Sequence, residues 1–306
     1  MDLSALRCFQ AVARHEHISR AAEELRVAQP SVSRTIARLE RELGVPLFHR
    51  QGRRIRLNRY GQTLLRRVDR ALHELDDARR ELTDAAGLHQ GSVSVAAETM
   101  LTLTGALTAY RAAHPEVAVH LHQVAAAAMP GRLRAREVDF CLASQPLAGP
   151  SLHGIDLARE QVLLAVAEAH PLAGRERVTV PELADEPFIT TRPGLWQRAL
   201  LERLFARHGL RPRITCDGEE PGAIQHLVSA GLGIGLLPAM SRQAAPTAAP
   251  VRWLRLDAPD CVRTLTLVWH ADAYLSTAAR RFRDLVVADL SDGTASGRVR
   301  TLPPAR

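Results

Sequence analysis

The first part of the fold is decided by the stretch AAEELRVAQPSVSRTIARLERELGVPLFHR, residues 21–50. Four apolar residues recur in it at the spacing of one helix face: Val32, Ile36, Leu39 and Leu43. Pro30 suits the first turn of this helix, where its missing N–H costs nothing. Gly44 is typical of a residue that ends a helix in the left-handed conformation. The pattern therefore predicts a helix that begins at Gln29 and ends before Gly44.

Two shorter helices are expected before it. One apolar stripe predicts a first helix over residues 2–14: Leu3, Leu6, Phe9 and Ala13. A second helix is expected over 20–25, with Ser19 as its N-terminal cap. Its small residues Ala21 and Ala22 allow another helix to approach closely. After the third helix, the alternation at 55–57 and a glycine-containing turn at 51–54 predict a β-hairpin.

Polar and basic side chains gather at the start of the third helix and in the hairpin. Polar residues at the N-terminal end of such a helix are what reading of the DNA major groove requires. Arginines in a hairpin can clamp phosphates or enter the minor groove. The residues expected to contact double-stranded DNA are Ser19, Arg20, Gln29, Pro30, Ser31, Ser33, Arg34, Arg38, Arg50, Arg53, Arg54 and Arg56.

The basic charge of the chain is concentrated near its start. Residues 1–67 carry 14 arginines against 6 acidic residues, whereas residues 68–306 carry 26 arginines against 27 acidic residues. Such asymmetry is typical of a nucleic-acid-binding module joined to a near-neutral body. The chain has no lysine, so its preference for arginine is not itself evidence for phosphate recognition. The alternative is a three-helix scaffold with a solvated basic loop.

A long helix is expected over residues 59–86. Its leucines and valine form a seam of the kind found in coiled coils: Leu65, Val68, Leu72, Leu75 and Leu82. Arg79 interrupts one layer of the seam. Two interpretations remain open at this point, namely packing against the protein's own body and a coiled coil between two copies of the chain.

From Ser92 onward, strands alternate with helices, which predicts an α/β body with a parallel sheet and crossover helices. The 306 residues suit two or three domains. We expect a DNA-binding domain over 1–58, a linker helix over 59–90 and a body over 91–290. Its first subdomain would span about 91–161 and 266–290, and its second about 162–265. Residues 291–306 are polar and rich in proline and arginine, and are expected to be disordered.

The run 21–50 resembles the N-terminal signature of LysR-type transcriptional regulators, and the resemblance continues more weakly across most of the chain. It implies an α/β protein with an N-terminal winged helix-turn-helix, a long linker helix and an effector domain like periplasmic binding proteins, made of two α/β subdomains. It also implies a regulator that assembles as a dimer or tetramer and responds to a small-molecule effector. RNA polymerase is a further candidate partner.

An effector would sit at the carboxyl ends of the strands, between the two subdomains. Hydroxyl groups and one arginine at these ends suggest a carboxylate-bearing ligand. The family usually has an uncharged residue near position 98, so Glu98 suggests an amine-bearing ligand instead. Each of these residues taken alone also fits a helix cap or a surface position. The expected effector contacts are Glu98, Thr99, Met100, Gln123, Ser144, Thr190, Thr191, Arg192 and Glu219.

Other function classes have weaker support. An enzyme or solute-binding protein would need a catalytic motif or a signal peptide, and neither is found. A thiol-based redox regulator would need a reactive cysteine with a partner, and the four cysteines are scattered. His120 and His122 share one face of a predicted strand, but we expect neither a metal nor a cofactor there. We also expect no dinucleotide site at the glycines of 231–235. With no apolar run long enough to span a bilayer, a cytoplasmic protein without a membrane partner is expected.

Overall fold

The structure is a computed structural model that describes residues 1–51, 54–86, 91–218, 221–242, 250–290 and 299–303. The chain folds as two compact units, Met1–Ala86 and Gly87–Arg306.

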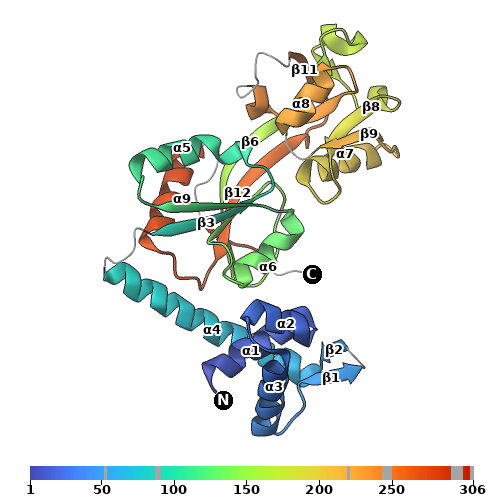
Figure 1. Ribbon diagram of the computed structural model, residues 1–306. Helices are drawn as coiled ribbons and strands as arrows, with labels where there is room; N and C mark the ends of the chain where they lie inside the picture. Colours follow the sequence, from blue (N-terminus) through green and yellow to red (C-terminus); the bar gives the residue numbers. More distant parts are fainter. Residues whose placement is uncertain (52–53, 87–90, 219–220, 243–249, 291–298, 304–306) are drawn as a thin grey trace. The chain divides into compact units, whose positions relative to one another are not determined.

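The first unit is a helix-turn-helix with a hairpin and a long helix (Figure 1). Its elements are α1 (Leu3–His15), α2 (Ile18–Leu25), α3 (Gln29–Leu43), the antiparallel strands β1 (Phe48–Gln51) and β2 (Arg54–Leu57), and α4 (Arg59–Ala85). One core joins them, with Phe9 and Ile36 fully buried at its centre. The predicted winged helix-turn-helix is confirmed.

The helix ends follow local chemistry, with one correction. The Asp2 side chain caps α1 by accepting from the backbone N–H of Ala5, and Gly44 ends α3 at φ +70°. The helix α2 begins at Ile18, so the prediction that Ser19 caps it was wrong. Ile18 packs against the core of the unit, and this apolar contact extends the helix to include Ser19.

The junction between the hairpin and α4 requires a glycine. Asn58 caps α4 by accepting from the N–H of Gly61, and its side-chain amide donates to the carbonyl of Pro46. A Cβ at Gly61 would lie 2.2 Å from the carbonyl oxygen of Leu47. Only glycine therefore allows the start of α4 to pass this close to the segment that leads into the hairpin.

The apolar seam of α4 has two different environments. Val68 and Leu72 are buried in the core of the first unit, so this half of the seam packs against the protein's own body. Leu75 is 48% exposed and Leu82 is 71% exposed within the single chain. Packing against the protein's own body therefore holds for the first half of the helix, whereas the second half of the seam stays exposed within the single chain.

The second unit is built around one nine-stranded sheet. The main order is β4 (Ala118–Gln123), β3 (Ser92–Ala97), β5 (Phe140–Ala143), β12 (Val262–His270), β6 (Leu152–Ala167), β11 (Val251–Leu256) and β7 (Arg177–Val178), with β10 (Gly235–Pro238) and β13 (Arg300–Thr301) also paired to β6. The strands β3, β4 and β5 run parallel, as predicted. β12 runs antiparallel to β5 and β6 because it returns from the second subdomain.

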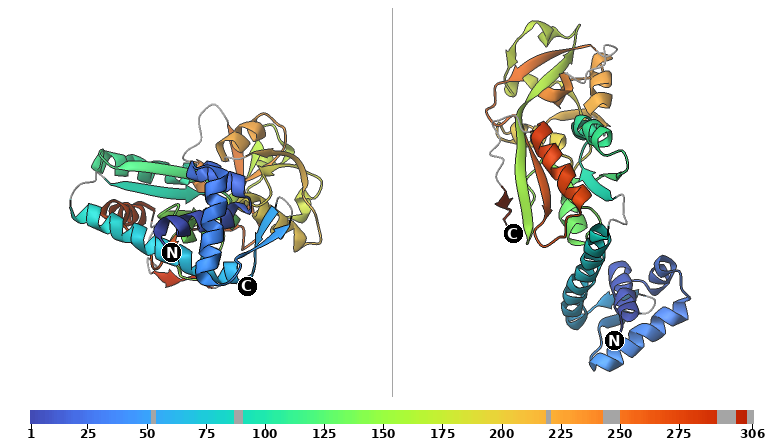
Figure 2. Two further views of the ribbon diagram at one scale, coloured as in Figure 1. Left: turned by 60° about the horizontal axis from the view of Figure 1, so that its bottom comes forward. Right: turned by 90° about the vertical axis from the view of Figure 1, so that its left-hand side faces the viewer.

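Helices cover the sheet in both subdomains (Figures 1 and 2). In the first, α5 (Thr104–Ala113) and α9 (Thr277–Leu290) share one core, and α6 (Met129–Arg134) packs in another. In the second, α7 (Trp196–Ala206) and α8 (Pro221–Ser229) pack on the sheet and on the parallel pair β8 (Pro187–Thr191) and β9 (Arg213–Gly218). Buried apolar faces thus fix each subdomain separately.

Two long strands connect the subdomains. The strand β6 pairs with β12 from Leu152 to Gln161, and then with β10 and β11 from Val162 to Ala167. The subdomains therefore change over between Gln161 and Val162 on β6, and near Val262 on β12. A pair of extended strands is a narrow connection, which permits the two subdomains to hinge.

The elements α6, β7, β11 and β13 were not predicted, and β13 shows that the expected disorder of the tail was wrong in one place. Within 291–306, the described residues Arg300 and Thr301 pair with β6, and Leu302 is buried in a core of the first subdomain. The burial of Leu302, together with the ion pair of Arg300 with Asp156, fixes this short strand. The rest of that prediction, 291–298 and 304–306, lies outside the described residues.

Candidate functional site

The exposed side of the helix-turn-helix carries most of the residues expected to contact DNA. Side chains along and beside α3 are exposed: Arg20, Gln29, Pro30, Arg34 and Arg38. Three serines are half-buried: Ser19, Ser31 and Ser33. Val32, Ile36 and Leu39 hold the opposite face of α3 in the core. The helix therefore presents a polar side to solvent while its apolar side fixes its position.

The two arginines of α3 differ in their surroundings. Arg38 lies 3.2 Å from a carboxylate oxygen of Asp2 and 4.0 Å from one of Glu42, so its charge is partly compensated. Arg34 donates from Nε to the carbonyl of Pro30 at 3.3 Å, and no carboxylate among the described residues pairs with it. Of the two, Arg34 has the positive charge that is more available to DNA.

The hairpin was expected to supply four arginines. Arg56 is exposed on β2. Arg50 and Arg54 belong to the paired strands β1 and β2, but their side chains lie outside the described part of the structure. Arg53 lies outside the described residues altogether.

In the second unit, a pocket of about 440 Å³ is lined by both subdomains. The first subdomain contributes Gln123–Ala125, at the end of β4 and just after it, and the second contributes Arg192, Pro193 and Leu195, between β8 and α7. Two of the expected effector contacts, Gln123 and Arg192, thus lie together in one pocket. Its place at strand ends near a helix N-terminus is where ligands bind in α/β sheets.

Glu98 lies beside this pocket and joins the subdomains from within. Its side chain is buried, and its Oε1 accepts from Gln145 Nε2 at 2.7 Å and from the backbone N–H of Trp196 at 3.1 Å. Its Oε2 accepts from the backbone N–H of Ser144 at 2.9 Å. Burial raises the pKa of Glu98, while these three hydrogen bonds and the charge of Arg263 oppose the rise. Because the carboxylate of Glu98 already accepts three hydrogen bonds from protein groups, in this arrangement it links the subdomains and does not offer a contact to an amine.

Arg263 forms a second link between the subdomains. Its side chain is 0% exposed, and on β12 it faces its register partner Glu160 on β6, with which it makes an ion pair. Its guanidinium lies 4.8 Å from the centre of the Trp196 ring and donates to Thr102 Oγ1 at 3.5 Å. Burial lowers the pKa of Arg263, and the charges of Glu160 and Glu98 raise it again. One buried cation therefore contacts both the η1 turn (Leu101–Leu103) of the first subdomain and α7 of the second.

The other expected effector contacts lie near these links but face the protein. Thr99 is buried and shares a hydrogen bond with Thr102 at 3.2 Å. Thr190 is buried, and Thr191 Oγ1 accepts from the N–H of Arg198 on α7, as a helix cap does. Met100 packs against the core, and Ser144 binds Glu98 through its backbone. Glu219 lies outside the described residues.

Three residues of this region were missed from the sequence: Gln145, Trp196 and Arg263. Arg263 had a signal, since it is the only arginine near the start of a strand in which apolar residues alternate with threonine. Trp196 is the first residue of α7, so its N–H is one that no helical carbonyl accepts. Gln145 carried no signal, because its partner Glu98 is 47 positions away.

The cysteines form no disulfide, and the histidines no metal-binding cluster, in the described part of the chain. All four cysteines are free, and burial raises the pKa of both Cys141 and Cys261 to about 12, so that neither forms a reactive thiolate near neutral pH. His120 and His122 lie on β4, and no group of three metal-binding side chains gathers within the described ranges. Among the helices described, none has the length and apolar character to cross a membrane.

Comparison with known proteins agrees with this architecture. Residues 3–62 match the family model of the bacterial regulatory helix-turn-helix protein, lysR family, and residues 86–291 match that of the LysR substrate binding domain. The second match alone covers more than half of the chain.

Two relatives match this chain over nearly their whole length. The uncharacterized HTH-type transcriptional regulator YybE of Bacillus subtilis is 34% identical over 297 residues, which cover 95% of this chain and 100% of YybE. The transcriptional dual regulator GltC of the same organism is 31% identical over 291 residues, covering 94% and 97%. A solved full-length OxyR variant of Pseudomonas aeruginosa, 21% identical, has a TM-score of 0.66 over 97% of this chain and 96% of its own, and it shows the fold alone. These relatives are regulators and not enzymes, and the chain belongs to the LysR family of DNA-binding transcriptional regulators.

Proposed function

We propose that a small-molecule effector binds between the two subdomains of the body and thereby changes how the helix-turn-helix contacts DNA. The observation that carries this proposal is the pocket of about 440 Å³ whose walls come from both subdomains. A ligand that touches both walls stabilises one hinge angle over others. Such differential binding is what a population shift between two arrangements of the regulator requires.

The lining of the pocket favours an effector that carries a carboxylate. Arg192 offers a guanidinium that can bind a carboxylate through two parallel hydrogen bonds, and Gln123 offers an amide. Val124, Pro193 and Leu195 supply apolar contact for a carbon skeleton. An amine-bearing effector has less support, because the nearby carboxylate of Glu98 accepts three hydrogen bonds from the protein.

A panel of small mono- and dicarboxylates, added to the protein bound to its genomic DNA site, tests this proposal. We expect one of them to change the DNA footprint, and Arg192→Ala to raise its half-maximal concentration at least tenfold, since a charge-assisted pair is lost. Arg213→Ala is the matched control, because it removes an exposed arginine of the same subdomain outside the pocket. If no carboxylate changes the footprint, or if both variants respond alike, the effector is not held by Arg192.

We also propose that the second half of α4 pairs with another copy of the chain. Leu75 and Leu82 lie seven positions apart on one face and are the exposed continuation of a seam whose first half is buried. A helix with this exposed stripe needs a partner surface. A dimer would place two α3 helices on half-sites about one helical turn of DNA apart, or a multiple of it.

Substituting both leucines should weaken this dimer. Leu75→Ala with Leu82→Ala removes apolar surface worth about 1.5–3 kcal/mol per fully buried leucine side chain, so we expect the dissociation constant of the dimer to rise at least tenfold. Glu74→Ala with Glu81→Ala is the control, because it shortens two side chains at exposed positions of α4 outside the seam. Sedimentation velocity over a concentration series measures the dissociation constant of the dimer for both double variants. Equal dissociation constants for the two double variants would show that α4 is not the dimer contact.

A further inference from the structure

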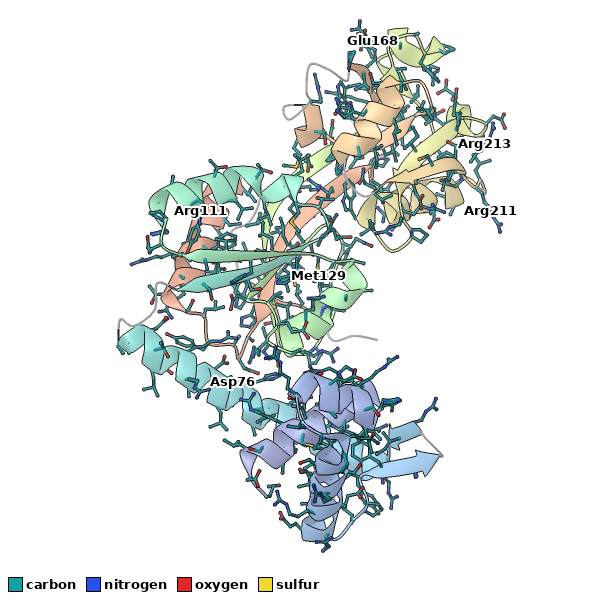
Figure 3. The ribbon with its side chains drawn as sticks, viewed as in Figure 1. Asp76, Arg111, Met129, Glu168, Arg211 and Arg213 are labelled. Carbon is teal, nitrogen blue, oxygen red and sulfur yellow. The ribbon has the colours of Figure 1, made fainter. Side chains whose placement is uncertain are left out.

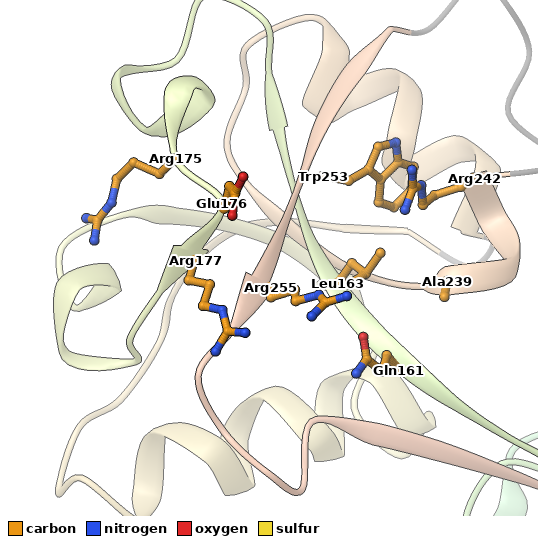
Figure 4. A pocket seen from close by; sticks show the side chains of 9 residues that line it. All are labelled: Gln161, Leu163, Arg175, Glu176, Arg177, Ala239, Arg242, Trp253 and Arg255. Atoms are coloured by element: carbon orange, nitrogen blue, oxygen red, sulfur yellow. The ribbon is translucent and has the colours of Figure 1, made fainter.

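The second subdomain has a basic pocket that is separate from the effector pocket. It has a volume of about 450 Å³ and shares no lining residue with the one near Arg192. Its lining comes from three neighbouring strands, β6, β11 and β7, with the loop before β7 and the η5 turn (Ala239–Arg242) at its sides (Figure 4). The residues are Gln161, Leu163, Arg175, Glu176, Arg177, Ala239, Arg242, Trp253 and Arg255. A near-neutral body thus concentrates four arginines in one hollow.

The strand register places two of these arginines directly side by side. Arg255 on β11 is the register partner of Arg177 on β7 and also of Leu163 on β6. Residues opposite one another on adjacent strands point to the same face of a sheet. Figure 4 shows the guanidinium groups of Arg177 and Arg255 extending to the same side as the amide of Gln161. Like charges directly opposite one another destabilise a sheet, so this pair has a cost when nothing binds it.

Within the described residues, carboxylates compensate only one of these four charges. Arg175 makes an ion pair with Glu182 at 2.6 Å, and Figure 4 shows it pointing away from the others. Arg177, Arg242 and Arg255 have no ion-pair partner among the described residues, although Glu176 lines the same pocket and Asp257 an adjoining one. Three guanidinium groups that have no ion-pair partner in the described part of the chain therefore lie around one hollow, which favours binding of a negatively charged ligand.

We propose that this pocket is a second binding site, specific for a small metabolite with at least two negatively charged oxygen groups. Each guanidinium group can bind carboxylate or phosphate oxygens through two parallel hydrogen bonds, so two adjacent ones can bind two charged groups of the same anion. Leu163 and Trp253 lie on the same face as Arg255 and give the floor of the pocket an apolar part that suits a short carbon skeleton. This second site is independent of the proposal that an effector binds near Arg192, because the two pockets share no lining residue.

Thermal unfolding of the full-length protein, followed by tryptophan fluorescence, tests the site. The probes are inorganic phosphate and citrate, each compared with chloride at equal ionic strength. We expect phosphate or citrate to raise the melting temperature in a saturable way, because an anion that binds only the folded state stabilises it. Stabilisation by citrate alone assigns the site to polycarboxylates, and stabilisation by phosphate assigns it to phosphate esters.

Variants separate this site from general charge effects. Arg177→Gln with Arg255→Gln should weaken anion binding at least tenfold, while Arg213→Gln, at the outer edge of the subdomain in Figure 3, should leave it unchanged. Without added anion, Arg255→Gln should melt at a higher temperature than the unaltered protein, because the opposed charges are gone. The proposal is overturned if neither probe acts beyond chloride, or if Arg213→Gln loses as much affinity. It is also overturned if the double variant loses affinity for duplex DNA and not for the anions, which would make the patch a DNA contact.

Discussion

Replacing Arg34 by alanine should weaken binding to the DNA site by about 1–3 kcal/mol, or roughly 5- to 150-fold. Arg34 is exposed on the polar side of α3 and has no carboxylate partner within the described residues. Its positive charge is therefore available to a base edge or a phosphate. Fluorescence anisotropy with labelled duplexes over a salt series measures the effect.

The salt series also tells which contact is lost. If Arg34 binds a phosphate, the variant should lose affinity uniformly across DNA sequences, and the slope of affinity against salt should fall by about one. If Arg34 binds a base, specificity at one position should relax instead. Arg79→Ala removes the same charge from an exposed position on α4 and serves as the control. Equal losses in the two variants would show that only net charge matters, and Arg34 would have no specific contact.

The DNA-binding unit could be predicted because its signals are local. The helix α3 follows from the spacing of Val32, Ile36 and Leu39, and its bounds follow from Pro30 and Gly44. Ser19 was misplaced because a capping residue and a helical one look alike in sequence, and the packing of Ile18 decided between them. Packing likewise separated the covered and exposed halves of α4, whose leucines and valine form one continuous seam in the sequence.

The cleft could be predicted only in outline. The strand ends that carry Gln123 and Arg192 follow from the α/β pattern, and both line the pocket. The partners of Glu98 could not be predicted, because Gln145 and Trp196 approach it from segments 47 and 98 positions away. The strand β11 was not predicted, because the apolar residues of VRWLRL do not alternate regularly around its arginines at 252 and 255.

The largest stability change should come from removing the buried cation that touches both subdomains. Arg263→Met keeps an unbranched side chain but leaves the Glu160 carboxylate without its main partner. Removing one member of a buried ion pair typically costs about 3–5 kcal/mol, because the remaining charge stays desolvated. We expect the unfolding free energy of the body to fall by this amount. Denaturant unfolding followed by fluorescence reports this unit alone, since all three tryptophans, Trp196, Trp253 and Trp269, lie within it.

A second substitution distinguishes a charge effect from lost packing. Arg263→Met combined with Glu160→Gln removes both charges, and the double variant should recover most of the lost stability, since buried ion pairs replaced by neutral groups are often tolerated. The coupling energy from this double-mutant cycle then measures the pair itself. If the double variant is no more stable than Arg263→Met alone, the loss comes from the contacts of Arg263 with Trp196 and Thr102. The arginine would then hold the subdomains together by packing against α7 and the η1 turn, and its charge would be incidental to the hinge.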